Sequence, residues 1–274
     1  RYTYADILTK LVTEGTSAPE TLRGSVVGET IKGEAGDDSI DALEGNDTIY
    51  GGDGADTINT GSGDDSIDAL EGNDTIYGGD GADTINTGSG DDVVYGGSGN
   101  DSIYNEFGND YIDGGDGDDY IETRSGNDTI VGGKGNDSIY ESSSGNDTFI
   151  YNLGDGNDTI YNHGYSDSDT IQFGDGITPE NVRFHGEDND LVITFEGSDG
   201  SIRVRNGLSS DTTKIENFTF EDGTAYTYEE VLSKLVTEGT SSPETLRGSI
   251  VGETIKGEAG NDSIDALAGN DTIY

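Results

Sequence analysis

Apolar residues recur along the chain at every ninth position. From residue 40 to residue 139 this position holds Ile in every repeat but one, which holds Val. The series is Ile40, Ile49, Ile58, Ile67, Ile76, Ile85, Val94, Ile103, Ile112, Ile121, Ile130 and Ile139. A fixed period over a dozen repeats is typical of a solenoid, in which each repeat is one structural unit.

Each nine-residue unit divides into a turn and a strand. In Gly51-Gly52-Asp53-Gly54-Ala55-Asp56-Thr57-Ile58-Asn59 the first six residues are rich in Gly, and the last three hold one apolar side chain. Glycine suits a tight turn, whereas Thr and Ile favour a strand. One buried Ile cannot offset the cost of ordering nine residues, about 1–2 kcal/mol each, so the units must stack. We therefore predict an all-β fold, a parallel β-roll with two nonapeptides per 18-residue coil.

Two longer periods overlie the nonapeptide. Residues 36–65 recur nearly unchanged as residues 63–92, a period of 27. Residues 2–50 recur as residues 226–274, a period of 224. This pattern indicates one whole large unit followed by the opening of the next, as in a longer array. Because the shorter of these periods is an odd number of nonapeptides, Tyr50 and Tyr77 are expected on opposite faces of the roll.

Composition excludes several classes of protein. The 274 residues hold 57 Asp and Glu against 13 Lys and Arg, a net charge of −44, and no Cys. Such a charge argues against nucleic acid or anionic lipid as a partner, because both reward Lys and Arg. The absence of Cys excludes a disulfide framework and a thiolate metal site. No segment approaches the ~18 consecutive apolar residues of a membrane span.

The sixth position of the repeat holds Asp without a break. Stacked coils would place these carboxylates about 4.8 Å apart, where they repel unless a cation lies between them. Ligands made only of carboxylate and carbonyl oxygen favour calcium over zinc or copper. The candidate ligands are Asp38, Asp47, Asp56, Asp65, Asp74, Asp83, Asp92, Asp101, Asp110, Asp119, Asp128 and Asp137, with Asp147, Asp262 and Asp271 beyond the regular array.

These nonapeptides resemble the RTX family of calcium-binding β-rolls in secreted bacterial proteins. The resemblance implies that each ion lies between a turn and the turn one coil later, with backbone carbonyls completing its shell. It implies ten or more Ca²⁺ ions, secretion through a type 1 system and a location outside the cell or at its surface. Glu29 and Glu253 replace the Asp in the first repeat of each copy, and we expect an end cap there.

The register changes after Tyr140. Asp137, Asp147, Asp158 and Asp169 are spaced more widely than the regular nonapeptide allows, so we expect the coil to widen and end here. Alternating apolar residues then predict strands joined as antiparallel hairpins, at 181–184, 191–195, 201–205 and 215–220. Turn signals separate them at residues 186–189, 197–200 and 221–223. This segment resembles the region that closes the roll after RTX arrays.

A short helix is predicted to follow these hairpins. Residues 227–230 form a capping box, Gly239 is a stop signal, and Val231, Leu232, Leu235 and Val236 form an apolar face. The same helix is expected near residues 4–12. The predicted domains are 1–23 (capping helix and linker), 24–146 (calcium-binding roll), 147–224 (roll end and hairpin cap), 225–247 (capping helix and linker) and 248–274 (start of the next roll).

The sequence favours a structural role over catalysis. His163 and His185 lack a Cys or Ser partner and are interpreted as turn residues, and a calcium-bound carboxylate cannot serve as a general acid. We expect a non-enzymatic repeat module of a large secreted or surface protein, such as an adhesin, matrix or surface-layer component. Its partners would be neighbouring copies in tandem, with self-association into fibres or a lattice as a further possibility.

Two alternatives remain open at this stage. The first is an accessory module of an RTX toxin or exoenzyme, which would aid secretion and folding. The second is a glycan-binding or ice-binding face. Tyrosines at the ninth position are the candidates for carbohydrate or protein contact: Tyr50, Tyr77, Tyr95, Tyr104 and Tyr140. Ice binding would need regular Thr ranks on one face, whereas Thr48, Thr57, Thr75 and Thr84 alternate with Ser and Tyr. We favour β-propensity on an exposed strand as the reason for these tyrosines.

Overall fold

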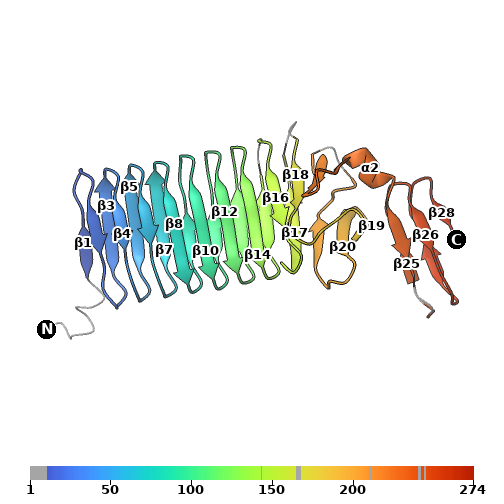
Figure 1. The fold of residues 1–274 in the computed structure, drawn as a ribbon, viewed down its shortest axis with the longest axis horizontal. Helices are drawn as coiled ribbons and strands as arrows, with labels where there is room; N and C mark the ends of the chain where they lie inside the picture. Colours follow the sequence, from blue (N-terminus) through green and yellow to red (C-terminus); the bar gives the residue numbers. More distant parts are fainter. Residues whose placement is uncertain (1–10, 143, 165–167, 210–211, 240–241, 244) are drawn as a thin grey trace.

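The protein is a long parallel β-solenoid closed at one end by a small antiparallel cap (Figure 1). The computed structural model describes residues 11–142, 144–164, 168–209, 212–239, 242–243 and 245–274. Two large sheets run the length of the roll, and consecutive strands alternate between them. The predicted all-β, parallel-roll fold is confirmed.

The first sheet has 12 strands in the order β1-β3-β5-β7-β9-β11-β13-β15-β17-β21-β20-β19. Its roll strands are β1 (Val12–Glu14), β3 (Thr30–Ala35), β5 (Thr48–Asp53), β7 (Ser66–Glu71), β9 (Thr84–Asn86), β11 (Ser102–Tyr104), β13 (Tyr120–Thr123), β15 (Ser138–Glu141) and β17 (Asn157–Asn162). Its last three are β21 (Ser201–Val204), β20 (Asp190–Phe195) and β19 (Val182–Glu187).

The second sheet has 11 strands in the order β2-β4-β6-β8-β10-β12-β14-β16-β18-β22-β23. They are β2 (Thr21–Arg23), β4 (Ser39–Asp41), β6 (Thr57–Asn59), β8 (Thr75–Asp80), β10 (Val93–Ser98), β12 (Tyr111–Asp116), β14 (Thr129–Lys134), β16 (Thr148–Tyr151), β18 (Thr170–Phe173), β22 (Asn217–Phe220) and β23 (Ala225–Thr227).

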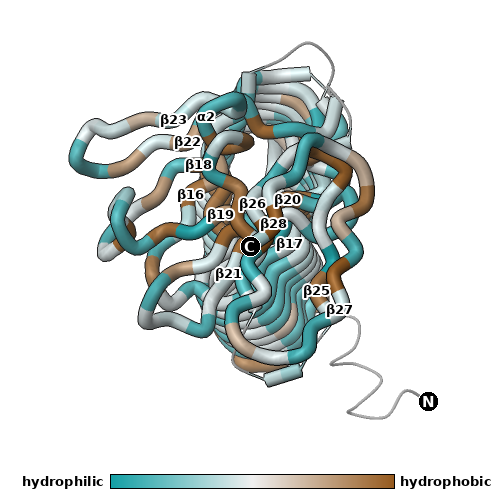
Figure 2. The backbone as a smooth tube through the Cα atoms, turned by 90° about the vertical axis from the view of Figure 1, so that its right-hand side faces the viewer, coloured by the Kyte–Doolittle hydropathy of each residue, from teal (hydrophilic) through white to brown (hydrophobic). Residues whose placement is uncertain are grey.

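Each strand of the regular roll pairs in parallel with the strand two nonapeptides later, so every Ile lies beside another apolar residue of its column. In the first sheet Ile49 is paired with Ile31 on one side and Ile67 on the other. These side chains are essentially inaccessible to solvent, and successive coils superimpose along the axis (Figure 2). Burying each Ile contributes about 1.5–3 kcal/mol, and the two facing columns form the core.

Several strands are longer than the expected three residues. In β5 and β7 the pairing continues past the Ile, with Gly52 opposite Leu70 and Asp53 opposite Glu71. The second turn position has a positive φ, which glycine adopts freely but which costs an L-residue about 1–2 kcal/mol. Leu43 and Leu70 nevertheless adopt it, at φ 84° and 78°.

The coil widens after the register change, as predicted, and three more parallel strands follow before the cap. Strands β16, β17 and β18 continue the parallel pairing, although their offsets widen. Ile130 is paired with Phe149, and Ile139 with Ile160, in both cases a partner farther along the chain than two nonapeptides. The extra residues fall between the strands, so the strands keep their places in the two sheets.

The cap extends both sheets rather than forming a separate body. Strand β21 is parallel to β17, and β22 is parallel to β18. Among the described residues, only the outermost pairs, β19–β20, β20–β21 and β22–β23, are antiparallel. The β19–β20 turn is just Asp188-Asn189, because Glu187 pairs with Asp190, so Gly186 and Glu187 belong to a strand and not to the predicted turn.

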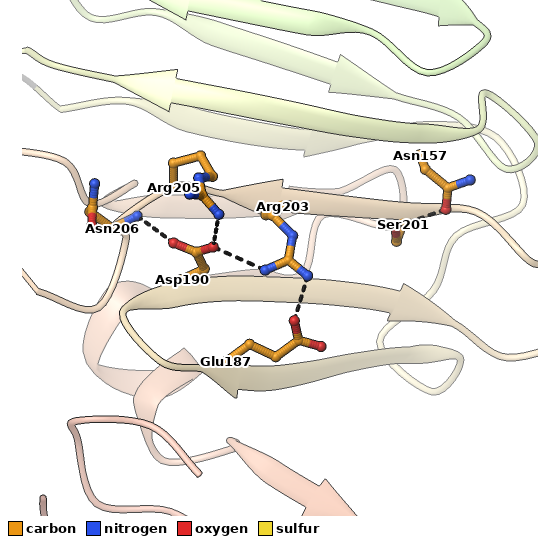
Figure 3. Close-up of polar contacts among 7 residues, drawn as sticks. All are labelled: Asn157, Glu187, Asp190, Ser201, Arg203, Arg205 and Asn206. Atoms are coloured by element: carbon orange, nitrogen blue, oxygen red, sulfur yellow. Dashed lines mark hydrogen bonds and ion pairs between the residues drawn. The ribbon is translucent and has the colours of Figure 1, made fainter. Parts of the chain in front are cut away.

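A buried carboxylate fixes the hairpin to the strand behind it (Figure 3). Asp190 is 6% exposed and accepts hydrogen bonds from Arg203 Nη1 at 2.9 Å and the Asn206 N–H at 2.9 Å. Arg205 is its second cationic partner. Arg203, on β21, also reaches across β20 to Glu187 on β19. Three strands are thus cross-linked at the point where the roll turns into its cap.

The capping helix is shorter than predicted. Helix α2 (Tyr228–Leu232) begins with the expected capping box, in which Thr227 and Glu230 exchange hydrogen bonds. It ends before Ser233 rather than at Gly239, and Val236 begins a strand instead of extending the apolar helix face. The corresponding helix predicted near residues 4–12 lies largely outside the described residues, and Val12 begins β1.

The second copy opens a new roll beyond the helix. Its three-stranded sheet holds β24 (Val236–Glu238), β26 (Thr254–Lys256) and β28 (Thr272–Ile273). Its two-stranded sheet holds β25 (Thr245–Arg247) and β27 (Ser263–Asp265). The pairing again joins strands two nonapeptides apart, with Ile255 opposite Ile273.

Candidate metal centre

The sixth-position aspartates form two continuous columns, one along each edge of the roll. One oxygen of each carboxylate accepts the backbone N–H of the Asp one coil earlier. Asp83 Oδ1 accepts from Asp65 at 2.8 Å, and Asp101 Oδ1 accepts from Asp83 at 2.8 Å. The same bond joins Asp38 to Asp56 and recurs along both edges as far as Asp128 and Asp137. The backbone therefore holds every carboxylate in one orientation.

The second oxygen of these carboxylates is buried without a hydrogen-bond donor among the described residues. This holds for Oδ2 of every candidate Asp from Asp38 to Asp137. The side chains are only 1–3% exposed. A buried carboxylate oxygen without a partner is costly, because burial removes the water that would solvate its charge. A row of such oxygens indicates a cation that the protein itself does not supply.

On one edge of the roll, first-position glycines such as Gly78, Gly96, Gly114 and Gly132 open a space beside these oxygens. A Cβ built on Gly96 would lie 2.5 Å from Asp101 Oδ2 and would overlap the carbonyl oxygen of Gly114, one coil later. On Gly114, it would lie 2.5 Å from both Asp119 Oδ2 and the Gly132 carbonyl oxygen. Carboxylate and carbonyl oxygens of adjacent coils thus face the same small space.

This donor set fits calcium. Calcium takes six to eight oxygen ligands in flexible geometry and accepts backbone carbonyls readily. In the described part of the chain no three Asp, Glu or His side chains converge on one point, so any ion must draw part of its shell from the backbone. Asp83, Asp101 and Asp119, with the carbonyls of the adjoining turns, would hold the ions on the edge where the glycines recur most regularly.

Burial raises the pKa of the column carboxyls. The pKa of Asp83 and Asp119 rises from 3.8 to about 7, and that of Asp128 to about 8. Removal from water is the main cause, and the like charge of the next Asp in the column adds to it. The accepted backbone N–H opposes both effects. A bound cation would favour the ionised form and reverse this penalty.

Glutamate stands at the start of one column in each roll, Glu29 before Asp47 and Glu253 before Asp271. Ser25 N–H donates to one carboxylate oxygen of Glu29, within its own turn, and Thr13 Oγ1 donates to the other at 3.5 Å. Glu253 makes the same two bonds, to Ser249 and Thr237. The longer side chain folds back onto its own turn and satisfies both oxygens, which agrees with the end cap expected at these positions.

The columns run further than the regular spacing indicates. Asp137 N–H donates to Asp158 Oδ1 at 3.1 Å, and Asp147 N–H donates to Asp169 Oδ1 at 2.9 Å. Asp158 and Asp169 are not among the candidate ligands predicted from the sequence, although each stands before Thr-Ile as in the regular repeats. Asp147 occupies its expected place in a column. Asp262 and Asp271 lie in the last coils of the second copy and are more exposed.

From residue 78 onward, the two edges of the roll differ at the first turn position. One edge carries Gly78, Gly96, Gly114 and Gly132. The other carries a buried polar column of Thr87, Asn105, Thr123, Glu141 and Asn162. Asn105 Nδ2 donates to Thr87 Oγ1 at 3.1 Å, and Asn162 Nδ2 donates to Asp169 Oδ2 at 2.7 Å. On this edge, side chains enter the space that glycine leaves open on the other.

Neither histidine forms a catalytic arrangement with other described residues. His163 is exposed, and its backbone N–H donates to the Glu141 carbonyl at 3.1 Å. His185 lies in strand β19 and not in a turn as expected. Its ring bridges the Val236 carbonyl at 2.7 Å and Thr194 Oγ1 at 2.8 Å. No described helix is long and apolar enough to cross a membrane.

The ninth-position tyrosines form short stacks on both faces of the roll. Tyr50 and Tyr77 lie in different sheets, as the odd number of nonapeptides between them predicts. Tyr77 stacks on Tyr95 with ring centroids 5.3 Å apart, and Tyr140 stacks on Tyr161 at 4.1 Å. In these two pairs the rings cover one another's faces, whereas Tyr104 is tilted against Tyr120. This arrangement does not favour the glycan-binding alternative.

Comparison with known families agrees with this geometry. The family described as RTX calcium-binding nonapeptide repeat (4 copies) matches the roll and the second copy, together more than half of the chain. The matched segments are 23–58, 32–67, 50–85, 59–94, 68–103, 77–112, 104–139 and 244–274.

The cap also has a family counterpart. A second family, described as haemolysin-type calcium binding protein related domain, matches residues 190–230. No curated protein gave a match to the chain. The calcium-binding roll predicted from the nonapeptides is supported by both family matches, and the chain belongs to the RTX calcium-binding repeat family.

Proposed function

We propose that the chain is a calcium-dependent structural module of a large secreted or cell-surface bacterial protein of the adhesin, matrix or surface-layer type. Its work is to fold into a rigid spacer where calcium is abundant. Proteins with RTX repeats are typically secreted and not usually catalytic, which supports a structural, non-enzymatic role outside the cell.

The observation that carries this proposal is the row of buried Oδ2 atoms from Asp38 to Asp137. Without a cation, these carboxylates must be desolvated beside one another when the roll closes. With calcium between adjacent turns, the same oxygens become ligands and the charges are offset. The number of Oδ2 atoms without a hydrogen-bond donor supports ten or more ions per chain. The edge that carries Gly78, Gly96, Gly114 and Gly132 is expected to bind calcium most tightly.

Folding and calcium binding are therefore one process. At submicromolar calcium the carboxylate columns repel, and the chain stays extended, a form suited to export through a type 1 system. At millimolar calcium, sites with dissociation constants of about 10⁻⁴–10⁻³ M or tighter fill, and their binding free energy becomes folding free energy. Adjacent sites share turns, so filling is expected to be cooperative along each edge.

Far-UV circular dichroism during a calcium titration tests this function, with magnesium as the matched control. We expect a cooperative gain of β signal with calcium and little with magnesium, which prefers octahedral geometry and retains its waters. Isothermal titration calorimetry on the same samples would count the ions. A complete β spectrum in EGTA at neutral pH would refute the coupling and leave the roll as a preformed scaffold.

A further inference from the structure

The chain contains the same 40-residue segment in two environments. Residues 11–50 and 235–274 differ at only four positions, among them Val26, which is Ile250 in the second copy. The first copy opens the main roll, and the second follows the cap. Because the sequences are nearly identical, a difference in solvent exposure between equivalent residues shows where neighbouring parts of the protein cover one copy and not the other.

The second copy is covered where the first is open. Ser249 is fully buried, whereas its equivalent Ser25 is half-buried. Ile250 is 36% exposed against 64% for Val26. The same holds for the strand at the start of each copy, because Val236 is half-buried and its equivalent Val12 is 50% exposed.

The covering element is the β19–β20 hairpin. Asp188 at its tip forms a parallel bridge with Ser249, and its carbonyl accepts the Ile250 N–H at 3.2 Å. The Asp188 carboxylate pairs with Arg247 at 2.9 Å. At Gly186 the hairpin lies directly against the second copy, since a Cβ there would overlap Ser249 Cβ and lie 2.6 Å from Ser249 Oγ.

A second contact lies at the other end of the same surface. His185 on β19 contacts the carbonyl oxygen of Val236, the first residue of β24, at 2.7 Å. Lys234, just before that strand, lies over the Tyr226 ring at 4.4 Å. The next roll is thus held at two points of the hairpin, Asp188 and His185.

The hairpin itself is fixed to the preceding roll. Its partner strand β21 pairs in parallel with β17, and Asp190 is held by two arginines and a backbone N–H (Figure 3). Forces on the second copy are therefore transmitted to the main sheets through hydrogen bonds and ion pairs instead of through a flexible linker.

We propose that the β19–β20 hairpin is a socket for the first coil of the next unit, so that successive 224-residue units join as a rigid, directional rod. The equivalent surface of the first copy, formed by Val12, Arg23, Ser25 and Val26, is then the docking site for the hairpin of another copy of this unit. This inference deepens the proposed structural function and rests on it.

Distance measurements across the joint test the socket in the calcium-loaded full chain. The chain has no Cys, so Asp116→Cys on the roll and Ser263→Cys beyond the joint give one specific spin-label pair. We expect a single narrow distance distribution. Ser249→Leu should abolish the narrow peak, whereas Ser25→Leu, the same substitution in the first copy, should preserve it. A broad distribution in the unsubstituted pair, or no effect of Ser249→Leu, would overturn the socket.

A milder pair guards against loss of folding in the second copy. The Arg247 side chain is 58% exposed, and Arg247→Ala removes only the Asp188 ion pair. Its control is Arg23→Ala, because Arg23 contacts Asp41 instead. Arg247→Ala should broaden the distribution with an unchanged circular dichroism spectrum. Absence of calcium-induced β signal in the unsubstituted chain would instead be a failure of the proposed function.

Sedimentation velocity tests the docking site on the first copy. The hairpin is occupied by the second copy of the same chain, so the unsubstituted protein should be monomeric in calcium. Ser249→Leu frees the hairpin, which should then capture the first coil of another molecule and produce dimers or longer chains. Adding Ser25→Leu should restore the monomer. A monomeric Ser249→Leu variant, or association that survives the double substitution, would refute this site.

Discussion

Asp83 offers a way to separate the two roles of a column carboxylate. Its Oδ1 accepts the Asp65 N–H at 2.8 Å, whereas its buried Oδ2 is the proposed calcium ligand. Asp83→Asn keeps an oxygen for the backbone bond but removes the charge and one anionic ligand. Asp83→Ala removes both functions. In the presence of calcium, the free energies of unfolding of the two variants should therefore differ by the contribution of one buried hydrogen bond.

The expected magnitudes follow from these contacts. A site with a dissociation constant of about 10⁻⁴–10⁻³ M contributes about 1.4–2.7 kcal/mol at about 10 mM calcium, and this is the expected loss for Asp83→Asn. Leaving the Asp65 N–H buried and unpaired costs a further 1–3 kcal/mol, roughly, in Asp83→Ala. The free energy of unfolding should thus fall in the order wild type, Asp83→Asn, Asp83→Ala.

Urea unfolding at fixed calcium measures this order, with Asp80→Asn as the control. Asp80 is exposed, and Ser98 Oγ donates to its carboxylate at 2.6 Å, so its substitution should change stability little. If Asp83→Asn were as stable as wild type in calcium, Oδ2 would not be a ligand. If Asp83→Ala were no less stable than Asp83→Asn, the backbone bond would contribute nothing.

Three further outcomes are expected. Burial raises the pKa of the column carboxyls Asp83 and Asp119 from 3.8 to about 7, so these carboxyls stabilise the metal-free fold fully below about pH 4 and lose that contribution as pH rises through about 7. Circular dichroism in EGTA should therefore show more β structure at pH 5 than at pH 8. Equal spectra at the two pH values would contradict the burial of these groups. Leu70 is 40% exposed and has a φ of 78°, which strains the backbone of an L-residue. Leu70→Gly should therefore stabilise the roll by about 1 kcal/mol. A lower urea midpoint for this variant would count against backbone strain at this position. Ile103 is fully buried, so Ile103→Ala should lower the free energy of unfolding in calcium by about 2–5 kcal/mol. A loss below about 1 kcal/mol would show that the neighbouring coils close the cavity that the substitution leaves.

The regular part of the roll could be predicted because each position of the nonapeptide has one structural task. The positions of Ile49 and Asp83 recur every nine residues, and one coil holds two nonapeptides. Equivalent residues of successive coils therefore stack directly, so the sequence spacing alone predicts which residues align. The same spacing located the candidate carboxylates. It could not show that one oxygen of each is used by the backbone and the other is left over.

The prediction fails where the spacing ceases to be regular. The strands around Asp158 and Asp169 keep their places in the sheets because pairing depends on the strand, and the extra residues fall between strands. The predicted end of helix α2 is wrong for another reason. Val236 has the apolar character that suits a helix face, but its partner Thr254 lies two nonapeptides further along the chain, and that long-range pairing draws it into a strand.

The two-nonapeptide coil also determines how the module would respond to tension. The 18 residues of one coil span about 60 Å when fully extended, whereas each folded coil adds only about 4.8 Å to the length of the roll. Because the coils are stacked in series between the two ends of the roll (Figure 1), a pull along the axis reaches the hydrogen bonds of an end coil first. Each coil lost would release about 55 Å of slack, and calcium would rewind it when the load falls.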